Sequence, residues 1–501
     1  MDLEDLWTPV SPRTLREVVD RLCEAGHVVA DAPVDDRRVI TGVCQDSRRV
    51  RPGDLYAALP GRRHHGADFA SEASARGAVA MLSDRPSDIV PTVVVDDPRA
   101  ALGPLAAWAY GNPSTAFDLY GVTGTNGKTS TVYLLEAALV AAGLRTGVVT
   151  GVTVRGPGTV RPATRTTPEA CELQQSFVEF VEEGVDAVAM EVSSHGLAEH
   201  RIDGSCFDVG VFTNLARDHL DYHPDMEAYY TAKARLFGRD LCERAAVCID
   251  DDYGRRLAAE VAVPHLTFSA RDPGADVYAT TVRAQRWGST FTLHHRGERV
   301  PVRLRVLGGH QVDNAVAALA ALSVRGIDLG AAVAGIEALD AIPGRLERVD
   351  VGQPFLALVD YVHNTAGQHR LFPYLRSVTP GRIVVVLGAT GERDPGKRAP
   401  LGFTAARYAE VVVVTDESAF SDDAADLRDA VAAGARRAGT AEVVVIPDRG
   451  EAIAVAVDLA GAGDTVLLAG RGHDPALVDD GVATAFDDRA ALRNALLTRA
   501  Y

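Results

Sequence analysis

The hydrophobic positions of the chain fall into short runs that alternate with longer helix-like stretches. Runs rich in β-branched residues, such as FDLYGVTG, VDAVAMEV and FDVGVFTNL, are interleaved with helical patterns such as TVYLLEAALVAAG. A second alternation begins near Phe355 and continues through RIVVVLGA, EVVVVTD, EVVVI and TVLLAG. Continuous apolar strands that alternate with helices are typical of parallel sheets covered on both faces.

Turn signals divide this pattern into three α/β domains. The first segment predicts strand, loop and strand over VITGVCQDSRRVRPGDLYAAL, and then a helix that runs into a strand over EASARGAVAMLSD. An Asn-Pro-Ser sequence at 112–114 and a Pro-Gly pair at 343–344 indicate the two junctions. We therefore expect domains at 1–113, 114–344 and 345–501. The expected fold class is α/β, with a central, mostly parallel sheet between an N-terminal α/β domain and a C-terminal Rossmann-like domain.

Composition narrows the class of protein. Hydrophobic residues make up 47% of the 501 positions and charged residues 24%, which excludes disorder as the main state. No apolar run approaches the roughly 18 residues of a membrane span, and the acidic N-terminal residues do not resemble a secretory signal. Six cysteines without a CxxC pair favour reduced thiols over a zinc site. The net charge of −17 disfavours nucleic acid as a partner, so we expect a cytoplasmic protein without nucleic-acid or membrane partners.

The sharpest chemical signal is the sequence GVTGTNGKT at 121–129. It follows a predicted strand and opens a predicted helix, although five residues separate its outer glycines where the strict phosphate-loop pattern has four. Glycines let backbone N–H groups turn toward phosphate, Lys128 would reach the β- and γ-phosphates, and the Thr129 hydroxyl would bind Mg²⁺. The alternative interpretation is an ordinary glycine-rich turn between strand and helix.

Polar side chains also follow the next predicted strands. Glu191 ends the strand in VDAVAMEV, where an open parallel sheet binds its ligands, so this carboxylate is placed to hold a metal. A further group follows the strand in VGVFTNL and consists of Asn214, Asp218, His219, Asp221 and His223. Lys233, taken alone, is most simply a solvent-facing lysine on a helix.

Together the motifs resemble the Mur ligase family. The segments that carry the resemblance are GVTGTNGKTS, MEVSSHGL, FTNLARDHLDYH, AKARLF, PGRLERVD, DYVHN, GERDPGKR and GRGHD, and they span almost the whole chain. The segment DSRRVRPGDLYAALPG is similar to the uridine-nucleotide domain of one branch, the UDP-N-acetylmuramyl-tripeptide synthetases. The resemblance implies an ATP-dependent ligase of peptidoglycan precursor synthesis. Such an enzyme phosphorylates the terminal carboxylate of UDP-N-acetylmuramoyl-L-alanyl-D-glutamate, and an amino acid then attacks the acyl phosphate.

The same resemblance assigns roles to individual residues. It implies catalytic roles for Lys128, Glu191, His219, Lys233 (carbamylated), Arg345 and Asp360. It places ATP at Gly124, Thr125, Asn126, Gly127, Lys128, Thr129, Ser130 and Asn314. It implies two Mg²⁺ ions, held by Thr129, Glu191, His219 and Lys233. It places the UDP-muramyl dipeptide and the amino acid at Ser47, Thr166, Thr167, Ser193, Arg201, Arg393, Gly470 and Asp474. We expect a monomer.

Departures from the family pattern leave the added amino acid open. The diaminopimelate-adding members read DNPR where this chain has Glu417-Ser418-Ala419-Phe420, and Glu199 stands where glutamine is frequent. Two alternative functions are a Mur-like ligase acting on another carboxylate in specialised metabolism and a non-catalytic, nucleotide-gated partner protein. A non-catalytic protein has no need for two metal sites, so the presence of Lys128, Thr129, Glu191, His219 and Lys233 argues against the non-catalytic alternative.

Overall fold

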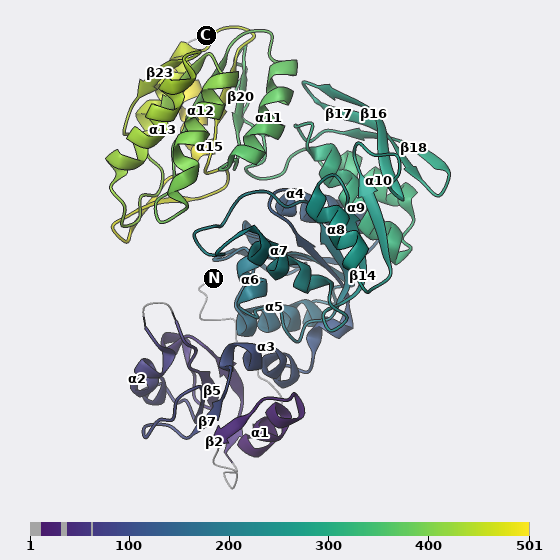
Figure 1. The fold of residues 1–501 in the computed structure, drawn as a ribbon, viewed down its shortest axis with the longest axis vertical. Coiled ribbons are helices and arrows are strands. Elements are labelled where there is room, and N and C mark those ends of the chain that lie inside the picture. Colours follow the sequence, from purple (N-terminus) through teal and green to yellow (C-terminus); the bar gives the residue numbers. More distant parts are fainter. Residues whose placement is uncertain (1–11, 32–37, 62–63, 500–501) are drawn as a thin grey trace.

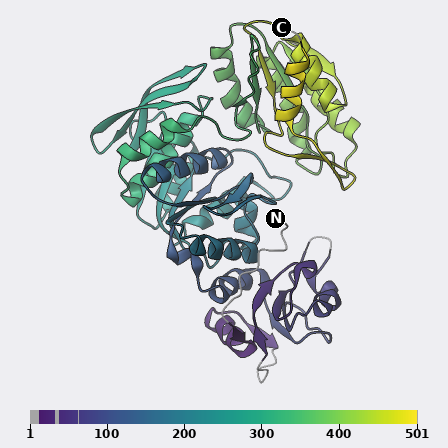
Figure 2. The ribbon, with the colours of Figure 1, turned by 180° about the vertical axis from the view of Figure 1, so that it is seen from behind.

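The computed structural model describes residues 12–31, 38–61 and 64–499, which form three α/β domains stacked along one axis (Figure 1). The same three bodies separate when the molecule is seen from behind (Figure 2). The N-terminal residues that argue against a secretory signal fall partly outside the described residues. Within the described part of the chain, no helix combines the length and apolar character needed to cross a membrane.

The N-terminal domain is built on a five-stranded sheet in the order β2-β7-β6-β5-β4. Its strands are β2 (Val29–Asp31), β4 (Gly42–Cys44), β5 (Asp54–Ala57), β6 (Ala80–Ser83) and β7 (Thr92–Val95). All neighbouring pairs are parallel except β2 with β7. A short pair, β1 (Arg13–Thr14) with β3 (Val39–Ile40), and three helices complete the domain: α1 (Leu15–Glu24), α2 (Ala70–Ala75) and α3 (Pro98–Ala109).

The central domain carries an eleven-stranded sheet in the order β11-β10-β9-β12-β8-β13-β14-β15-β16-β17-β18. The parallel middle consists of β8 (Asp118–Thr123), β9 (Thr146–Val149), β12 (Ala187–Glu191), β13 (Phe207–Phe212), β14 (Cys242–Cys248), β15 (His265–Ser269) and β16 (Val277–Gln285). The antiparallel edges consist of β10 (Thr153–Arg155) and β11 (Val160–Pro162) on one side, and β17 (Gly288–His295) and β18 (Glu298–Leu304) on the other.

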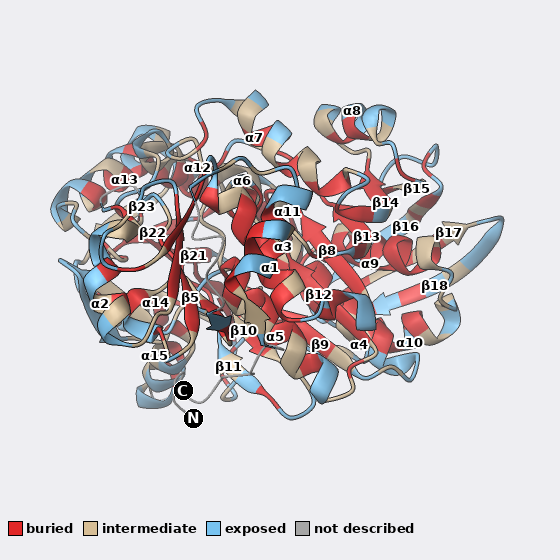
Figure 3. Cartoon of the chain, turned by 90° about the horizontal axis from the view of Figure 1, so that it is seen from below, coloured by how far each residue is buried: buried red, intermediate tan, exposed pale blue. Residues whose placement is uncertain are grey.

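Helices cover both faces of this sheet, as the continuous apolar strands predict. One face packs against α4 (Lys128–Ala141), α9 (Gln311–Arg325) and α10 (Leu329–Ala338). The other packs against α5 (Ala170–Glu182), α6 (Ser194–Ala198), α7 (Met226–Ala234) and α8 (Asp252–Glu260). The strands between the two layers are buried along almost their whole length (Figure 3).

The C-terminal domain has a six-stranded sheet in the order β19-β20-β24-β21-β22-β23. Its strands are β19 (Glu347–Arg348), β20 (Leu356–Val359), β21 (Ile383–Leu387), β22 (Val411–Val414), β23 (Glu442–Val445) and β24 (Thr465–Leu468), and only β19 is antiparallel to its neighbour. Helices α11 (Thr365–Val378), α12 (Arg398–Tyr408) and α13 (Ala424–Ala438) cover one face, and α14 (Arg449–Leu459) and α15 (Asp488–Thr498) cover the other. A hairpin of β25 (Ala476–Asp479) and β26 (Val482–Ala485) lies outside this sheet.

Candidate active site

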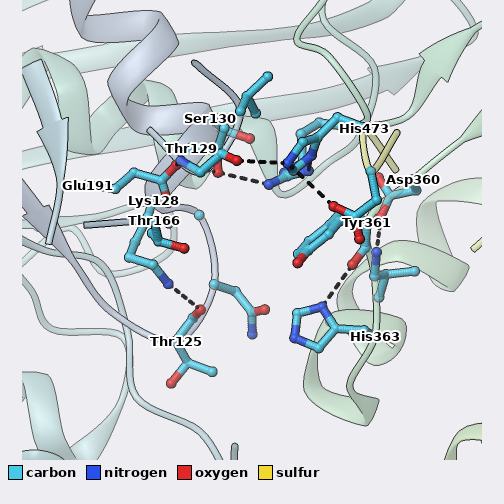
Figure 4. A pocket seen from close by; sticks show the side chains of 18 of the residues that line it. Thr125, Lys128, Thr129, Ser130, Thr166, Glu191, Asp360, Tyr361, His363 and His473 are labelled. Atoms are coloured by element: carbon cyan, nitrogen blue, oxygen red, sulfur yellow. Dashed lines mark hydrogen bonds and ion pairs between the residues drawn. The ribbon is translucent and has the colours of Figure 1, made fainter. Parts of the chain in front are cut away.

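A cavity of about 650 Å³ lies between the central and C-terminal domains. Figure 4 shows side chains of the phosphate loop and of β12 facing side chains of the C-terminal domain across this space. The predicted site residues that line it are Thr125, Asn126, Gly127, Lys128, Thr129, Ser130, Thr166, Glu191, His219, Asn314, Arg345, Asp360, Arg393 and Asp474. Residues far apart in the sequence therefore meet in one cleft.

The phosphate loop joins the end of β8 to the start of α4. Gly127 precedes the first residue of the helix with φ of 92°, which glycine adopts without strain. Asn214, which follows β13, fixes the loop by accepting a hydrogen bond from the Asn126 N–H through Oδ1 and donating one to the Asn126 carbonyl. The loop is thus held open at a helix N-terminus, a geometry suited to phosphate.

Lys128 folds back over this loop. Its ammonium donates to the carbonyl oxygens of Gly124 and Thr125, each at 3.0 Å. Burial lowers the pKa of Lys128, and the charge of Glu191 works in the opposite direction. A phosphate entering the loop would offer this ammonium an anionic partner in place of two neutral carbonyl groups.

Thr129 links the two sides of the cleft. Its hydroxyl donates to Glu191 Oε1 at 2.9 Å and accepts from Arg345 Nη2 at 2.8 Å. Glu191 is 3% exposed and also accepts from the Gly151 N–H. A buried carboxylate beside a hydroxyl is an oxygen donor set that suits Mg²⁺. The predicted metal residues Thr129 and Glu191 therefore meet.

Lys233 is buried rather than solvent-facing. Its side chain is 1% exposed, its ammonium nitrogen donates to the Gly124 carbonyl at 2.9 Å, and it lies 4.8 Å from the centre of the Tyr229 ring. Burial, together with the charge of Lys128, holds the pKa of Lys233 well below its usual value. His219 lines the cavity nearby, and burial likewise lowers its pKa. Across the described part of the chain, no three His, Cys, Asp or Glu side chains converge as a metal-binding group.

The C-terminal domain contributes a mixed group of charged and aromatic side chains. Asp360, which follows β20, accepts from the backbone N–H groups of Leu346 and Val362, and burial raises its pKa to about 6. Burial also raises the pKa of Asp474 to about 6. The Arg345 guanidinium packs 4.6 Å from the centre of the Tyr361 ring and also donates to Thr129 of the phosphate loop. Its positive charge acts on Asp360 as well, because it lowers the pKa of that carboxyl group.

Several predicted residues do not line this cavity. Gly124 and Lys233 lie beneath it, and Gly470 borders a smaller pocket with Glu417. Ser47 lies in the N-terminal domain, where its hydroxyl donates to Glu72. The remaining three, Thr167, Ser193 and Arg201, form one group: the Thr167 hydroxyl accepts from the Ser193 N–H, and Arg201 donates to the Thr167 carbonyl.

The structure adds residues to the cleft that the role assignment did not include. Asp218 accepts from Asn364 Nδ2 at 3.0 Å and lies 3.4 Å from His363 Nε2, so it joins the two domains. Burial works to raise the pKa of Asp218, but the hydrogen bond and charge of His363, together with His219 and Lys397, outweigh burial and hold the pKa well below its usual value. His473 Nε2 donates to the Gly151 carbonyl oxygen at 3.2 Å across the cleft. The motifs DYVHN and GRGHD, which contain these histidines, were the available signal.

Comparisons with known proteins agree with this architecture. Three family models match the chain: "Mur ligase family, catalytic domain" over residues 39–109, "Mur ligase middle domain" over 122–322 and "Mur ligase, glutamate ligase domain" over 344–472. The chain is 45% identical over 500 residues to UDP-N-acetylmuramoyl-L-alanyl-D-glutamate–2,6-diaminopimelate ligase of Streptomyces avermitilis, covering 97% of this chain and 98% of that protein.

Solved structures give the same result. A UDP-N-acetylmuramoyl-L-alanyl-D-glutamate–2,6-diaminopimelate ligase superposes with a TM-score of 0.68 at 28% identity, covering 97% of this chain and 99% of that one. The fold is also that of MurF ligase from Thermotoga maritima, solved in complex with ADP, with a TM-score of 0.63 at 21% identity over 91% of this chain and 96% of that one. With the family models matching all three domains and a relative this similar over its full length, the chain belongs to the Mur ligase family.

Proposed function

We propose that the chain is the ATP-dependent ligase that adds an amino acid to UDP-N-acetylmuramoyl-L-alanyl-D-glutamate in peptidoglycan precursor synthesis. The observation that carries this proposal is the single cavity that joins the phosphate loop to Arg393 and Asp474 of the C-terminal domain. Such a cavity can hold ATP, a carboxylate and an amine in line. The names of the relatives at 45% identity support the same substrate.

The nucleotide end of the site is assigned to the phosphate loop and Asn314. Backbone N–H groups at the start of α4 and the Lys128 ammonium would hold the β- and γ-phosphates. Arg345 already contacts Thr129, so its guanidinium is placed to neutralise charge on the transferred phosphoryl group.

Mg²⁺ fits the oxygen donors of this cleft. Thr129 and Glu191 would hold one ion, and Glu191, His219 and carbamylated Lys233 would hold a second. Mg²⁺ bound there supplies positive charge that offsets repulsion between the carboxylate and the phosphates. The uncharged amine that burial favours at Lys233 is the form that would attack CO₂: an N–C bond forms as one C=O π bond breaks and its electron pair moves to oxygen, a proton leaves the nitrogen for solvent, and an anionic carbamate results.

The reaction has two steps. A carboxylate oxygen of the dipeptide attacks the γ-phosphorus, an O–P bond forms, the bond to the bridging oxygen breaks, and ADP leaves. The amine of the amino acid then attacks the carbonyl carbon of the acyl phosphate, a C–N bond forms, a proton leaves the nitrogen, and phosphate departs with the C–O electron pair. Lys128 and Arg345 would stabilise the charge that develops in the first step.

The organic substrates are assigned to the two ends of the cleft. Ser47, Thr166, Thr167, Ser193 and Arg201 would hold the UDP-linked dipeptide between the N-terminal and central domains. Arg393 would bind the carboxylate of the incoming amino acid, with Gly470 and Asp474 beside its side chain. The relatives are named for diaminopimelate, whereas Phe420 offers no cation to a second carboxylate, so the identity of the amino acid is left to experiment.

ADP release with the UDP-muramyl dipeptide and a panel of amino acids tests this function. We expect release that requires both organic substrates, together with a product whose mass equals the dipeptide plus the amino acid minus water. Lys128→Ala should lower the rate by at least about a hundredfold, the usual cost of one charge-stabilising donor. Activity that is independent of the UDP-linked dipeptide, with another carboxylate as the better substrate, would overturn the proposal.

The remaining expectations accompany this proposal. We expect the reaction to take place in the cytoplasm, because its proposed substrates are nucleotides, and we expect the enzyme to be a monomer. We keep the domain limits at residues 113 and 344; the first lies one residue after Asn112, whose φ is 54°, and the second is at Gly344, whose φ is 65°. Both are turn conformations that interrupt regular structure between the sheets.

A further inference from the structure

Arginine and glutamate side chains alternate across the seam between the N-terminal and central domains. Arg99, at the start of α3 in the N-terminal domain, lies 3.6 Å from Glu169 Oε2 and 3.4 Å from Glu199 Oε2 of the central domain. Arg201 lies 2.9 Å from Glu169 Oε1 and 2.6 Å from Glu199 Oε2. The two guanidinium groups therefore share the same two carboxylates.

This quartet is largely shielded from solvent. The side chains of Glu169 and Arg201 are 10% and 12% exposed, and those of Glu199 and Arg99 are 22% and 26% exposed. Such pairing holds the side chains in place more firmly than pairing on an open surface.

The four side chains Arg99, Arg201, Glu169 and Glu199 are part of a longer row of ion pairs. Glu169 also lies 3.5 Å from Arg165, which lines the main cavity, and Arg165 approaches Glu172 at 3.9 Å. Glu172 in turn pairs with Arg49 of the N-terminal domain, two residues from Ser47. The row thus runs from the N-terminal domain to the edge of the cavity, along the path that the proposed function gives to the UDP-linked dipeptide.

Arg201 keeps an unused donor in this row. Its Nη1 donates to the Thr167 carbonyl and its Nη2 to Glu199, but its buried Nε has no hydrogen-bond partner within the described part of the chain. A buried donor left unpaired costs free energy, and a further oxygen ligand would satisfy it.

Glu199 has the properties of an anion that can be displaced. Burial works to raise its pKa, but Arg201 and Arg99 outweigh burial and hold the pKa of Glu199 below its usual value, so the group is ionised. Its other oxygen accepts from the Tyr222 hydroxyl at 3.3 Å, which gives the carboxylate a second partner outside the arginine pair. Its side chain is also more exposed than that of Glu169.

We propose that Arg99 joins Arg201, which the proposed function already assigns to the UDP-linked dipeptide, in binding an anionic group of that substrate, a phosphate or a carboxylate, and that Glu199 occupies this position until the substrate displaces it. The inference rests on the proposed function for its ligand. Arg99 is then a substrate-positioning residue that the N-terminal domain contributes, so binding of this anion also ties that domain to the central one. The free energy needed to break the ion pairs of Glu199 then lowers the net affinity for the substrate.

Glu199→Gln tests the displaced carboxylate. Glutamine keeps the shape and the hydrogen-bonding oxygen but removes the charge, so we expect the dissociation constant of the UDP-muramyl dipeptide to fall about two- to fivefold, the size of one partly exposed ion pair. The gain should shrink as salt screens the site. The matched control is Glu136→Gln, which removes the carboxylate that pairs with Arg155 in the same domain and should leave binding unchanged. Unchanged or weaker binding by Glu199→Gln would overturn the displacement.

Arg99→Gln tests the second arginine. We expect binding of the dipeptide to weaken at least about tenfold, with the KM for ATP unchanged. The double variant Arg99→Gln/Glu199→Gln separates binding from structure. If Arg99 only neutralised Glu199, the double variant would bind as tightly as wild type, which would overturn the proposal. Weak binding by the double variant, with thermal stability restored, supports it.

Shorter ligands identify the anion. Equal losses for UDP and for the full dipeptide in Arg99→Gln assign the site to the diphosphate, and a loss confined to the full dipeptide assigns it to a carboxylate. If wild type binds neither ligand, the proposed function itself fails. If wild type binds both and Arg99→Gln binds both equally well, the proposed function stands and only this inference fails.

Discussion

Replacement of Lys233 tests the most unusual environment in the site. Among the described residues, the side-chain nitrogen donates one hydrogen bond, to the Gly124 carbonyl, and the aliphatic part of the side chain is buried. A charged lysine there would be an unpaired buried cation, which is strongly unfavourable. We expect the native side chain to be uncharged or carbamylated, and its function to depend on the carbamate.

Two replacements separate packing from chemistry. Lys233→Ala removes three buried methylenes and a hydrogen bond, so we expect a loss of about 2–4 kcal/mol in the free energy of unfolding. Lys233→Met fills most of the same volume without the amine, and its stability should stay within about 1.5 kcal/mol of wild type. Both should lose at least about a hundredfold in ligation rate, because even an indirect metal ligand is worth about 10–100-fold.

The assay is ADP release with and without added formate or acetate. A short carboxylate can enter the space left by Lys233→Ala and replace the carbamate oxygens, so activity should recover in part, whereas Lys233→Met leaves no such space and should not recover. Labelled bicarbonate should give a carbamate signal in wild type that is missing from both variants. Full activity of either variant without additive would refute the carbamate assignment.

Three further predictions concern the C-terminal domain. Because the pKa of Asp360 is raised to about 6, its negative charge is lost as pH falls through that value, and the ligation rate should fall there in wild type but not in Asp360→Asn, as measured by pH profiles at saturating substrate. Gly470→Ala would place a Cβ 2.0 Å from Glu417 Oε1, so its thermal unfolding temperature should drop further than that of Gly439→Ala, which has positive φ but open space. Phe420→Arg should raise kcat/KM for diaminopimelate relative to lysine and ornithine. If diaminopimelate is the best substrate of the wild type, the prediction that Phe420 disfavours it is wrong.

The parallel sheets could be predicted from the sequence because strands buried on both faces consist of continuous apolar runs. β21 is apolar throughout, and β12 is apolar up to its last residue, Glu191; both strands lie between two helical layers. The antiparallel edge β16–β18 was not predicted. Apolar and polar residues are mixed along β16 and β17, so these strands contain no continuous apolar run. Trp287, in the turn between them, is 42% exposed and gives no clear turn signal.

The site was predictable where residue type and position both carried information. The phosphate loop combines glycines with Lys128 and Thr129 at a strand–helix junction, and Glu191 ends the neighbouring strand. The burial of Lys233 was not predictable from its helix, because a lone lysine on a helix gives no sign of which face it occupies. The contacts of Asp218 with His363 depend on how two domains meet, which no local pattern records.

Contacts between polar site residues join the central and C-terminal domains. Thr129 bonds Arg345, and Asp218 bonds Asn364, both across the cleft, while the Tyr374 hydroxyl donates to the Gln285 carbonyl at 3.0 Å at its outer edge. Polar interfaces of this kind permit relative domain motion, because water can replace each bond. ATP would engage the phosphate loop and Arg345 together and so strengthen the contact between the domains. Because Arg393 and Asp474, which we propose bind the amino acid, belong to the C-terminal domain, we expect nucleotide binding to hold this proposed site against the phosphate loop.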